Sequence, residues 1–231
     1  MAANAGPKLD GDSRSRRVRV EIRVVEMSSH YGKAERYLCR KSSVFREIVR
    51  QVGPCTLKPS PDYFSVLVHT IVSQQLSTRA ALTIGSRLQE SLNGKRLTPQ
   101  GIQRLADEKI RQCGLSGGKT KSLRDLCRKC LDGSLPLDRL TELADEEVCE
   151  LLLEVHGIGP WSVDMFLIFC LGRQDVLPVG DFGLRAAVQQ HYELHELPSP
   201  PLLKEIAEPW RPYRTVATWY CWRSRGPVPQ S

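Results

Sequence analysis

The sequence predicts an all-α protein built from many short helices. Apolar residues recur at three- and four-residue spacing over most of the chain, as on one face of a helix. Glycine, proline and Asn-Gly signals interrupt these runs at short intervals. One segment, 17–25 (RVRVEIRVV), alternates apolar and charged residues like a strand, but a single strand has no sheet to join.

Composition restricts the class of protein. Apolar residues make up 41% of the 231 residues and charged residues 26%, which is typical of a globular chain. No window resembles a membrane span or a signal peptide, so we expect an intracellular chain without a membrane partner. A monomer is taken as the default oligomeric state. The net charge of +7 and pI of about 9.1 favour a polyanionic partner such as nucleic acid.

The two ends of the chain are expected to be tails. Residues 1–30 are expected to be a poorly ordered basic segment, for which a solvated tail is favoured over a nuclear signal or a DNA-contacting arm. Residues 226–231 form a short C-terminal tail. From Tyr31 onward helical signals dominate.

Local signals place the helices between these tails. The expected helices run over 63–72, 80–92, 119–131, 148–155, 182–192, 202–207 and 212–222, with further helices opening at Pro99 and Pro160. Ser60-Pro61 and Thr98-Pro99 are helix starts, and Asn93-Gly94 is a helix end. The acidic run 145–147 suits a helix N-terminus, and Gly114–Gly118 is expected to be a loop.

The cysteines are expected to be reduced and structural. Cys127 and Cys130 share a helical stripe with neighbouring leucines, so we interpret them as small buried hydrophobes. No second cysteine pair or histidine lies at metal-ligand spacing, and the sequence predicts no metal site.

A tight turn between two helical runs, VHGIGPWSVDMF at 155–166, is a candidate phosphate site. Pro160 can begin the second helix, so the amides of Gly157, Ile158 and Gly159 can face outward near its N-terminus. Amides at the positive end of a helix dipole bind anions, and a DNA phosphate fits them. An ordinary tight turn capped by glycine explains the pattern equally well.

Two aspartates are candidates for chemistry. Asp181 precedes a helical run, where Asp is a favoured N-cap, but a carboxylate there can also stabilise a cationic sugar. Asp164 lies inside an apolar helix and is the second choice.

Four motifs in order resemble a known family. They are DYF at 62–64, IVSQQLST at 71–78, GLS at 114–116 followed by Lys119, and the hairpin with LPVGD ending at Asp181. This set is similar to the helix-hairpin-helix (HhH-GPD) DNA glycosylase superfamily, in its 3-methyladenine DNA glycosylase II branch. The resemblance covers roughly 44–222.

The resemblance implies a two-lobed fold with the active cleft between the lobes. The glycosylase domain would span 31–225, with a central lobe of about 63–171 and a second lobe of about 31–61 plus 181–225. The double-stranded DNA partner would carry a damaged base that is flipped out and hydrolysed from its sugar.

The same resemblance implies an activity and a catalytic residue. Asp181 would be catalytic, and the product an abasic site left by an alkylated purine of the 3-methyladenine or 7-methylguanine type. Trp161 stands where lyase-competent relatives carry a lysine, so we expect a glycosylase without lyase activity. A glycosylase for deaminated or mismatched bases, and a non-catalytic DNA-binding module, are the alternatives.

The resemblance also suggests which residues meet the DNA. The base pocket would contain Trp161, Tyr213, Met165 and Trp210, although Trp161 also fits a core position. Trp219 and Trp222 are interpreted as mostly core. The DNA contacts would be Gly157, Ile158, Gly159, Gln74, Gln75, Lys119, Lys121 and Arg185, with Gln75 the first choice for the side chain that fills the vacated space.

No iron–sulfur cluster or other cofactor is expected. Members with a cluster have four closely spaced cysteines after the catalytic aspartate, and this chain has only Cys221 after Cys170.

Overall fold

The computed structural model describes residues 30–226, and no strand occurs in that range. The all-α prediction is confirmed. The segment 17–25 and the tail residues 1–29 and 227–231 lie outside the described residues. The α-helices are α1 Gly32–Lys41, α2 Ser43–Val52, α3 Tyr63–Ser73, α4 Thr78–Glu90, α5 Pro99–Gln103, α6 Asp107–Gln112, α7 Gly117–Asp132, α8 Asp145–Leu153, α9 Pro160–Phe169, α10 Phe182–His191, α11 Pro200–Ala207 and α12 Arg214–Arg223, with 3-10 turns at Leu137–Arg139 and Glu208–Trp210.

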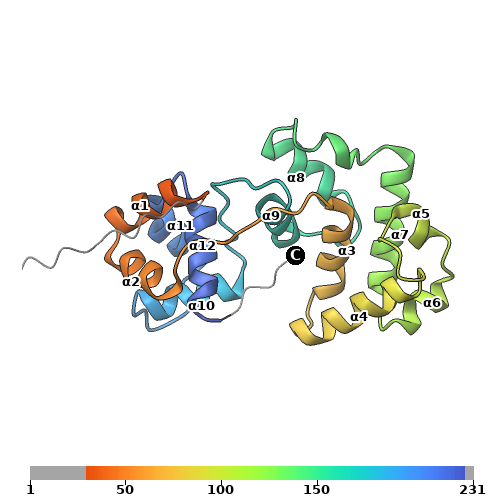
Figure 1. Cartoon of the computed structure of the whole chain (residues 1–231), viewed down its shortest axis with the longest axis horizontal. Helices are drawn as coiled ribbons and strands as arrows, with labels where there is room; N and C mark the ends of the chain where they lie inside the picture. The colour runs from red at the N-terminus through yellow and green to blue at the C-terminus, as the bar shows by residue number, and fades with distance from the viewer. Residues whose placement is uncertain (1–29, 227–231) are drawn as a thin grey trace, which may run out of the picture.

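The helices gather in two groups (Figure 1). Helices α1, α2, α10, α11 and α12 lie together, and α12 packs on both α2 and α10. In the other group α3 packs on α4, α7 and α9, and α8 packs on α9. The chain crosses from the first group to the second after α2, and it returns after α9.

Side chains cap the N-termini of six of the twelve described α-helices: α3, α4, α5, α7, α10 and α11. Thr98 caps α5 and accepts from the Gly101 amide, as its Thr-Pro pair predicted. The start of α3 differs, because Asp62 rather than Ser60 accepts from the Ser65 amide. The expected loop 114–118 is shorter, because the Ser116 hydroxyl caps α7 and brings the next two glycines into its first turn.

Helix α9 is mostly apolar and is buried between its neighbours. Phe166 and Ile168 are 0% exposed and Val163 is 2% exposed, so the helix offers water almost no face. Its burial against α3 and α8 fixes its N-terminus, the end that carries Trp161.

A buried hydrogen-bond network fixes α12 relative to α1. The Glu35 carboxylate, 0% exposed, accepts from the Tyr220 hydroxyl at 2.9 Å and from the Cys55 amide at 2.7 Å. Burial is the main reason that the pKa of Tyr220 is raised. The network holds α12 in one rotation, which determines where its last turn, with Trp222, points.

Cys127 is 0% exposed, as the sequence predicted for a small buried hydrophobe. Cys130, which had the same prediction, is only half-buried. All eight thiols are free, and burial raises the pKa of Cys127 and of Cys130 to about 12. Among residues 30–226 no cluster of His, Cys, Asp or Glu is arranged to hold a metal ion. No helix in that range is long and apolar enough to cross a membrane.

Candidate active site

Asp181 lies at the N-terminus of α10, where three N–H groups hold its carboxylate. Oδ1 accepts from the Leu184 amide at 2.6 Å and from the Trp222 indole at 2.8 Å. Oδ2 accepts from the Trp161 indole at 2.8 Å. Because Trp161 belongs to α9 and Trp222 to α12, both helix groups contribute to this one carboxylate.

The hydrogen-bond pattern leaves one oxygen of Asp181 available. Each carboxylate oxygen has about two acceptor positions, so Oδ1 is satisfied while Oδ2 retains one. The side chain is partly exposed. Asp181 therefore caps α10, and its carboxylate is fixed by hydrogen bonds while one acceptor position remains free. The N-cap interpretation and the catalytic interpretation of this residue are compatible.

Trp222 belongs to this site and was misplaced by the sequence interpretation. It is only half-buried, its indole stacks on Phe169 with centroids 5.8 Å apart, and its N–H reaches Asp181. Trp219, at 4% exposure, is a core residue as predicted. The sequence reasoning also missed Phe182, which is 67% exposed directly after Asp181. An aromatic residue at the first helical position beside a candidate aspartate is the signal that could have identified it.

Three predicted pocket residues form no hydrogen bond with Asp181. Trp210 is 1% exposed, packs edge-to-face on Phe45, and is a core residue. Met165 is 7% exposed within α9. Tyr213 precedes α12 and contacts Tyr37, so it lies about 13 Å along the helix axis from Trp222. Of the predicted pocket side chains, only Trp161 hydrogen-bonds to Asp181.

Asp164 lies one turn after Trp161 on α9. It is half-buried, and no described residue donates a hydrogen bond to its carboxylate. Burial, and secondarily the charge of Asp181, raise the pKa of Asp164 to about 6. A proton is therefore bound more tightly to Asp164 in the folded chain than in the unfolded chain.

Asp164→Asn is expected to change how stability depends on pH. Between pH 3.8, the ordinary carboxyl pKa, and about 6, the folded wild type holds a proton that the unfolded chain has lost, so its unfolding free energy falls as pH rises. Asn cannot ionise, so the stability of the variant relative to wild type should increase through this window and level off above it. Urea unfolding of both proteins from pH 4 to 8 measures this, and a constant difference would contradict it.

The hairpin before α9 depends on Gly157. Its φ of +80° is left-handed, and an added Cβ would overlap the Ser122 hydroxyl. That hydroxyl donates to the Gly118 carbonyl at 3.1 Å and lies 3.3 Å from His156 Nδ1. The turn is therefore packed directly on α7.

Only part of the predicted amide cluster is available to an anion. The Ile158 amide donates to the Val155 carbonyl at 3.0 Å and its side chain is 6% exposed, so this amide already has an acceptor within the protein. Within residues 30–226 the amides of Gly157 and Gly159 have no acceptor. Gly159 is also the N-cap of α9, so its amide lies at the positive end of that helix.

The turn between α3 and α4 is attached to the hairpin. Gln74 Nε2 donates to the Gly157 carbonyl at 2.8 Å, so Gln74 links the two loops. Gln75 is exposed and has a φ of 56°, which places it at the tip of the turn. The two adjacent glutamines thus have different positions, one anchored and one pointing into solvent.

Two of the three predicted cationic contacts are occupied within the protein. Lys119 Nζ donates to the carbonyls of Val72 and Gln74 at 2.7 and 2.8 Å, and partial burial lowers its pKa. Arg185 Nε donates to the Pro198 carbonyl at 2.8 Å. Both side chains brace loops through these bonds. Lys121 is exposed on α7, one residue before the serine beneath the hairpin.

Comparison with known proteins identifies the class that this fold and site define. Residues 68–212 match the model of the HhH-GPD superfamily of base excision DNA repair proteins. The chain belongs to this superfamily.

Individual relatives extend the match over most of the chain. The chain is 30% identical to the alkylbase DNA glycosidase-like protein mag2 of Schizosaccharomyces pombe, over 84% of this chain and 94% of that protein. The S. pombe 3-methyladenine DNA glycosylase Mag1, solved in complex with abasic DNA, has a TM-score of 0.76 and 32% identity, over 83% of this chain and 96% of that one. The structure of a DNA-3-methyladenine glycosidase from Bacillus halodurans has a TM-score of 0.74 and 34% identity, and the match covers 87% of this chain and 91% of that one.

Proposed function

We propose that the chain hydrolyses the N-glycosidic bond of a flipped-out alkylated purine in double-stranded DNA and leaves an abasic site. The observation that carries this is the Asp181 carboxylate, held by two indoles and an amide with one oxygen position unused. The names of the relatives, 3-methyladenine and alkylbase glycosylases, support the substrate class.

Asp181 would act on the sugar rather than on the base. As the base departs, the sugar becomes an oxocarbenium-like cation, and a fixed carboxylate beside it lowers the energy of that state. The free position on Oδ2 can also accept a proton from the attacking water. Because three donors hold the carboxylate before the substrate arrives, little reorganisation is needed during the reaction.

The aromatic side chains would select a cationic base. An indole face attracts a cation by about 0.5–2 kcal/mol, and Trp161 and Trp222 both lie at Asp181. Alkylated purines carry positive charge and leave without strong acid assistance, and no basic side chain hydrogen-bonds to Asp181. A tryptophan at 161 has no amine to form a Schiff base with the sugar, so we propose that the DNA strand remains intact.

DNA would be held by the surface around this carboxylate. The free amides of Gly157 and Gly159 suit a phosphate of the damaged strand, with Lys121 nearby on α7. Gln75, at the tip of the α3–α4 turn, can enter the space that the flipped base leaves and hydrogen-bond the orphaned partner. Such a protein acts where DNA is kept, which is inside the cell: the nucleus of a eukaryote or the cytoplasm of a bacterium.

We propose that the reaction needs no iron–sulfur cluster or other cofactor. Cys221 is the only cysteine after Asp181, so the chain lacks the four-cysteine ligand set at that end. Base release that persists after dialysis against a chelator, in protein shown to be metal-free by elemental analysis, is the expected result.

A base-release assay tests the substrate and the product. The protein is incubated with duplexes containing 7-methylguanine, 3-methyladenine, hypoxanthine or uracil, and free bases are separated by chromatography. We expect release of the methylated purines, with strands that break only after alkali treatment. Release of uracil alone would overturn the alkylpurine assignment, and strand breaks before alkali would overturn the absence of lyase activity.

A further inference from the structure

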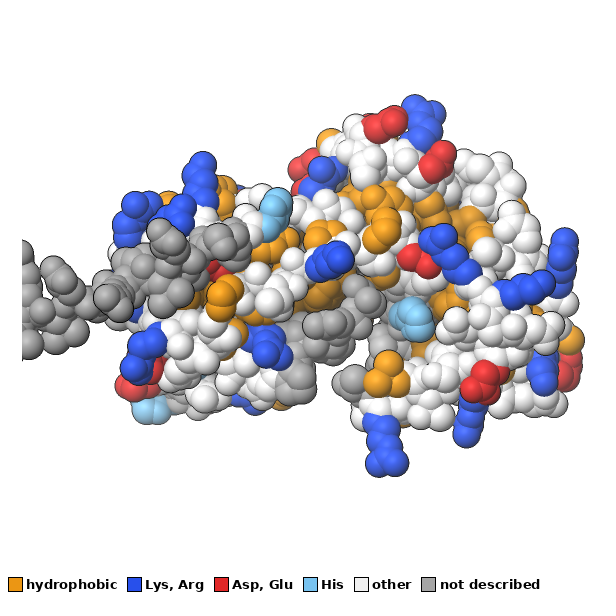
Figure 2. All heavy atoms as spheres, in the orientation of Figure 1, with side chains coloured by type: hydrophobic (Ala, Val, Ile, Leu, Met, Phe, Trp, Pro, Cys, Tyr) orange, Lys and Arg blue, Asp and Glu red, His pale blue; other side chains and the backbone are white. Residues whose placement is uncertain are grey.

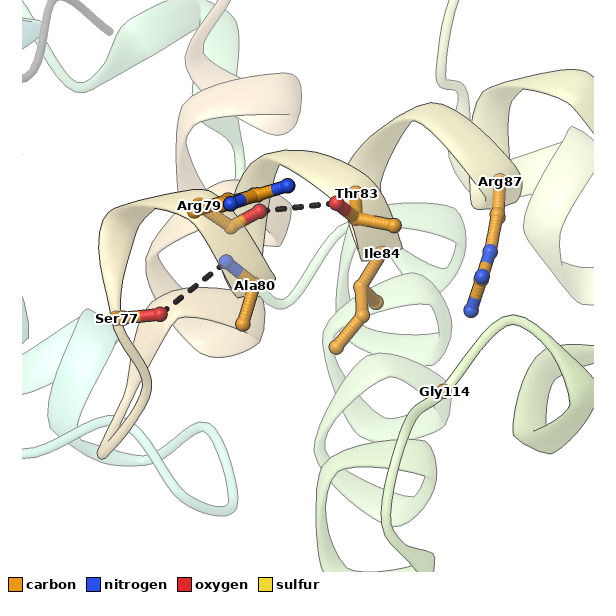
Figure 3. Close-up of a pocket in the computed structure, with 7 residues that line it drawn as sticks. All are labelled: Ser77, Arg79, Ala80, Thr83, Ile84, Arg87 and Gly114. Atoms are coloured by element: carbon orange, nitrogen blue, oxygen red, sulfur yellow. Dashed lines mark hydrogen bonds between the residues drawn. The ribbon is translucent and has the colours of Figure 1, made fainter.

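A shallow groove of about 430 Å³ lies along α4, apart from Asp181 and the hairpin. Its walls are one face of α4 and the loop that carries Gly114 (Figure 3). The groove begins at Ser77, which is two residues after Gln75. It is therefore continuous with the turn that would enter the DNA.

The shape of the groove depends on a close approach of the loop to the helix. Gly114 has a φ of +110°, and a Cβ there would lie 3.0 Å from Ile84 Cγ1, so glycine lets the loop lie against α4. Thr83 Oγ1 donates its proton to the Arg79 carbonyl, whereas Ser77 Oγ accepts from the Ala80 amide and keeps its own O–H as a donor (Figure 3). The positive charge of the groove comes from its two arginines.

The side chains of Arg79 and Arg87 are exposed, and neither guanidinium forms an ion pair or a hydrogen bond with a described residue. Arg87 extends from α4 toward the loop at Gly114 (Figure 3). Other arginines of this helix group are paired, such as Arg96 with Asp62 and Arg111 with Glu108. Lys and Arg side chains also project from the surface in the region of α4 (Figure 2).

The spacing of the two guanidinium groups suits one DNA strand. Arg79 and Arg87 are eight residues apart, about 12 Å along the helix axis. A DNA strand carries one phosphate for about every 3.4 Å of duplex axis, so this span corresponds to three or four phosphates when α4 lies along that axis. The planar guanidinium binds phosphate through two parallel hydrogen bonds, and the groove between the two groups is open to solvent.

The position of the groove indicates which strand it meets. Gln74 joins the α3–α4 turn to the hairpin, and α4 runs from that turn away from α9 (Figure 1). The hairpin amides would hold the strand with the flipped nucleotide. We then expect α4 to lie on the other side of Gln75 from that strand. We propose that this groove binds the backbone of the strand opposite the damaged base, with Arg79 and Arg87 as phosphate ligands. This inference rests on the proposed function.

The test compares Arg79→Gln/Arg87→Gln with a matched control. Arg36→Gln/Arg40→Gln removes the same charge from α1, where both arginines are exposed and lack a partner among the described residues. Binding of the full chain to a labelled duplex with a stable abasic analogue is measured across a salt series. The groove variant should bind about tenfold more weakly at physiological salt, and its slope of log affinity against log salt should be shallower by about 2, while the control keeps the wild-type slope.

Neutral phosphate replacements assign the strand. Methylphosphonates in the opposite strand near the abasic site should weaken wild type to the level of the groove variant and leave the variant unchanged. Methylphosphonates in the damaged strand should weaken both proteins equally. A groove variant with the wild-type salt slope, or one that loses sensitivity only to the damaged strand, would overturn the inference.

Failure of the groove and failure of the proposed function give different results. If wild type releases a methylated base and binds the abasic duplex while the groove variant matches it in every measurement, only the groove assignment is wrong. If wild type releases no base, the proposed function is wrong whatever the salt slopes show.

Discussion

Asp181→Asn is expected to lower the rate of base release by about 100- to 1000-fold while DNA binding remains. Asn has the shape of Asp and is an equally good N-cap, so its amide oxygen can still accept from the Leu184 amide at the start of α10. The variant loses the negative charge that stabilises the cationic sugar. Single-turnover base release from a methylated duplex measures the chemical step, and titration of an abasic duplex measures binding.

The control for this variant is Asp62→Asn. Asp62 caps α3 by accepting from the Ser65 amide, as Asp181 caps α10, but it pairs with Arg96 rather than with an indole. Its substitution removes one N-cap carboxylate charge outside the candidate site and should leave base release unchanged. Base release by Asp181→Asn at the wild-type rate would remove Asp181 from the chemistry, and an equal loss in both variants would indicate a general effect of the lost charge.

The sequence predicted those features that depend on local signals. Helix periodicity, the Thr98-Pro99 start and the position of Pro160 at the start of α9 are set by residues within one or two turns. The same is true of Asp181, whose capping role follows from its place before α10. The order of the family motifs then indicated that the hairpin and this aspartate belong to the same family signature.

The surroundings of Asp181 could not be predicted in the same way, because they depend on tertiary packing. Trp210 and Trp222 lie in the same part of the sequence, yet one is buried on Phe45 and the other donates to Asp181. The rotation of α12, fixed partly by the buried Tyr220 hydroxyl, directs Trp222 toward Asp181, whereas Trp210 lies in the 3-10 turn before that helix. The spacing of apolar residues between Trp210 and Trp222 does not indicate which tryptophan is buried and which one reaches Asp181.

Cationic side chains raise a similar difficulty. Lys119 and Arg185 contribute to the basic charge that suggested a nucleic-acid partner, but both donate to backbone carbonyls. Arg79 and Arg87 contribute equally to that charge and are free of such contacts among the described residues. Whether a cation is available to DNA depends on which carbonyl oxygens lie within its reach, and this is known only from the fold.

Gly157→Ala is expected to destabilise the protein by at least about 2 kcal/mol and to reduce binding to abasic DNA. A residue with a Cβ is strained at a φ of +80°, and the added methyl group would displace the Ser122 hydroxyl from its contacts with Gly118 and His156. The hairpin would then move relative to α7, and the free amides would lose their common direction. Urea unfolding and abasic-duplex titration measure the two effects.

Two further variants separate the causes. Gly159→Ala is the matched control, because Gly159 has an extended φ of −114° and an added Cβ there meets no atom within 4 Å, so stability should change little. Ser122→Ala/Gly157→Ala removes the hydroxyl that the methyl group would displace but keeps the left-handed backbone. If steric overlap is the larger cost, the double variant regains stability relative to Gly157→Ala. If it regains none, backbone strain alone accounts for the requirement, and the close packing of the turn on α7 is not what makes glycine necessary at 157.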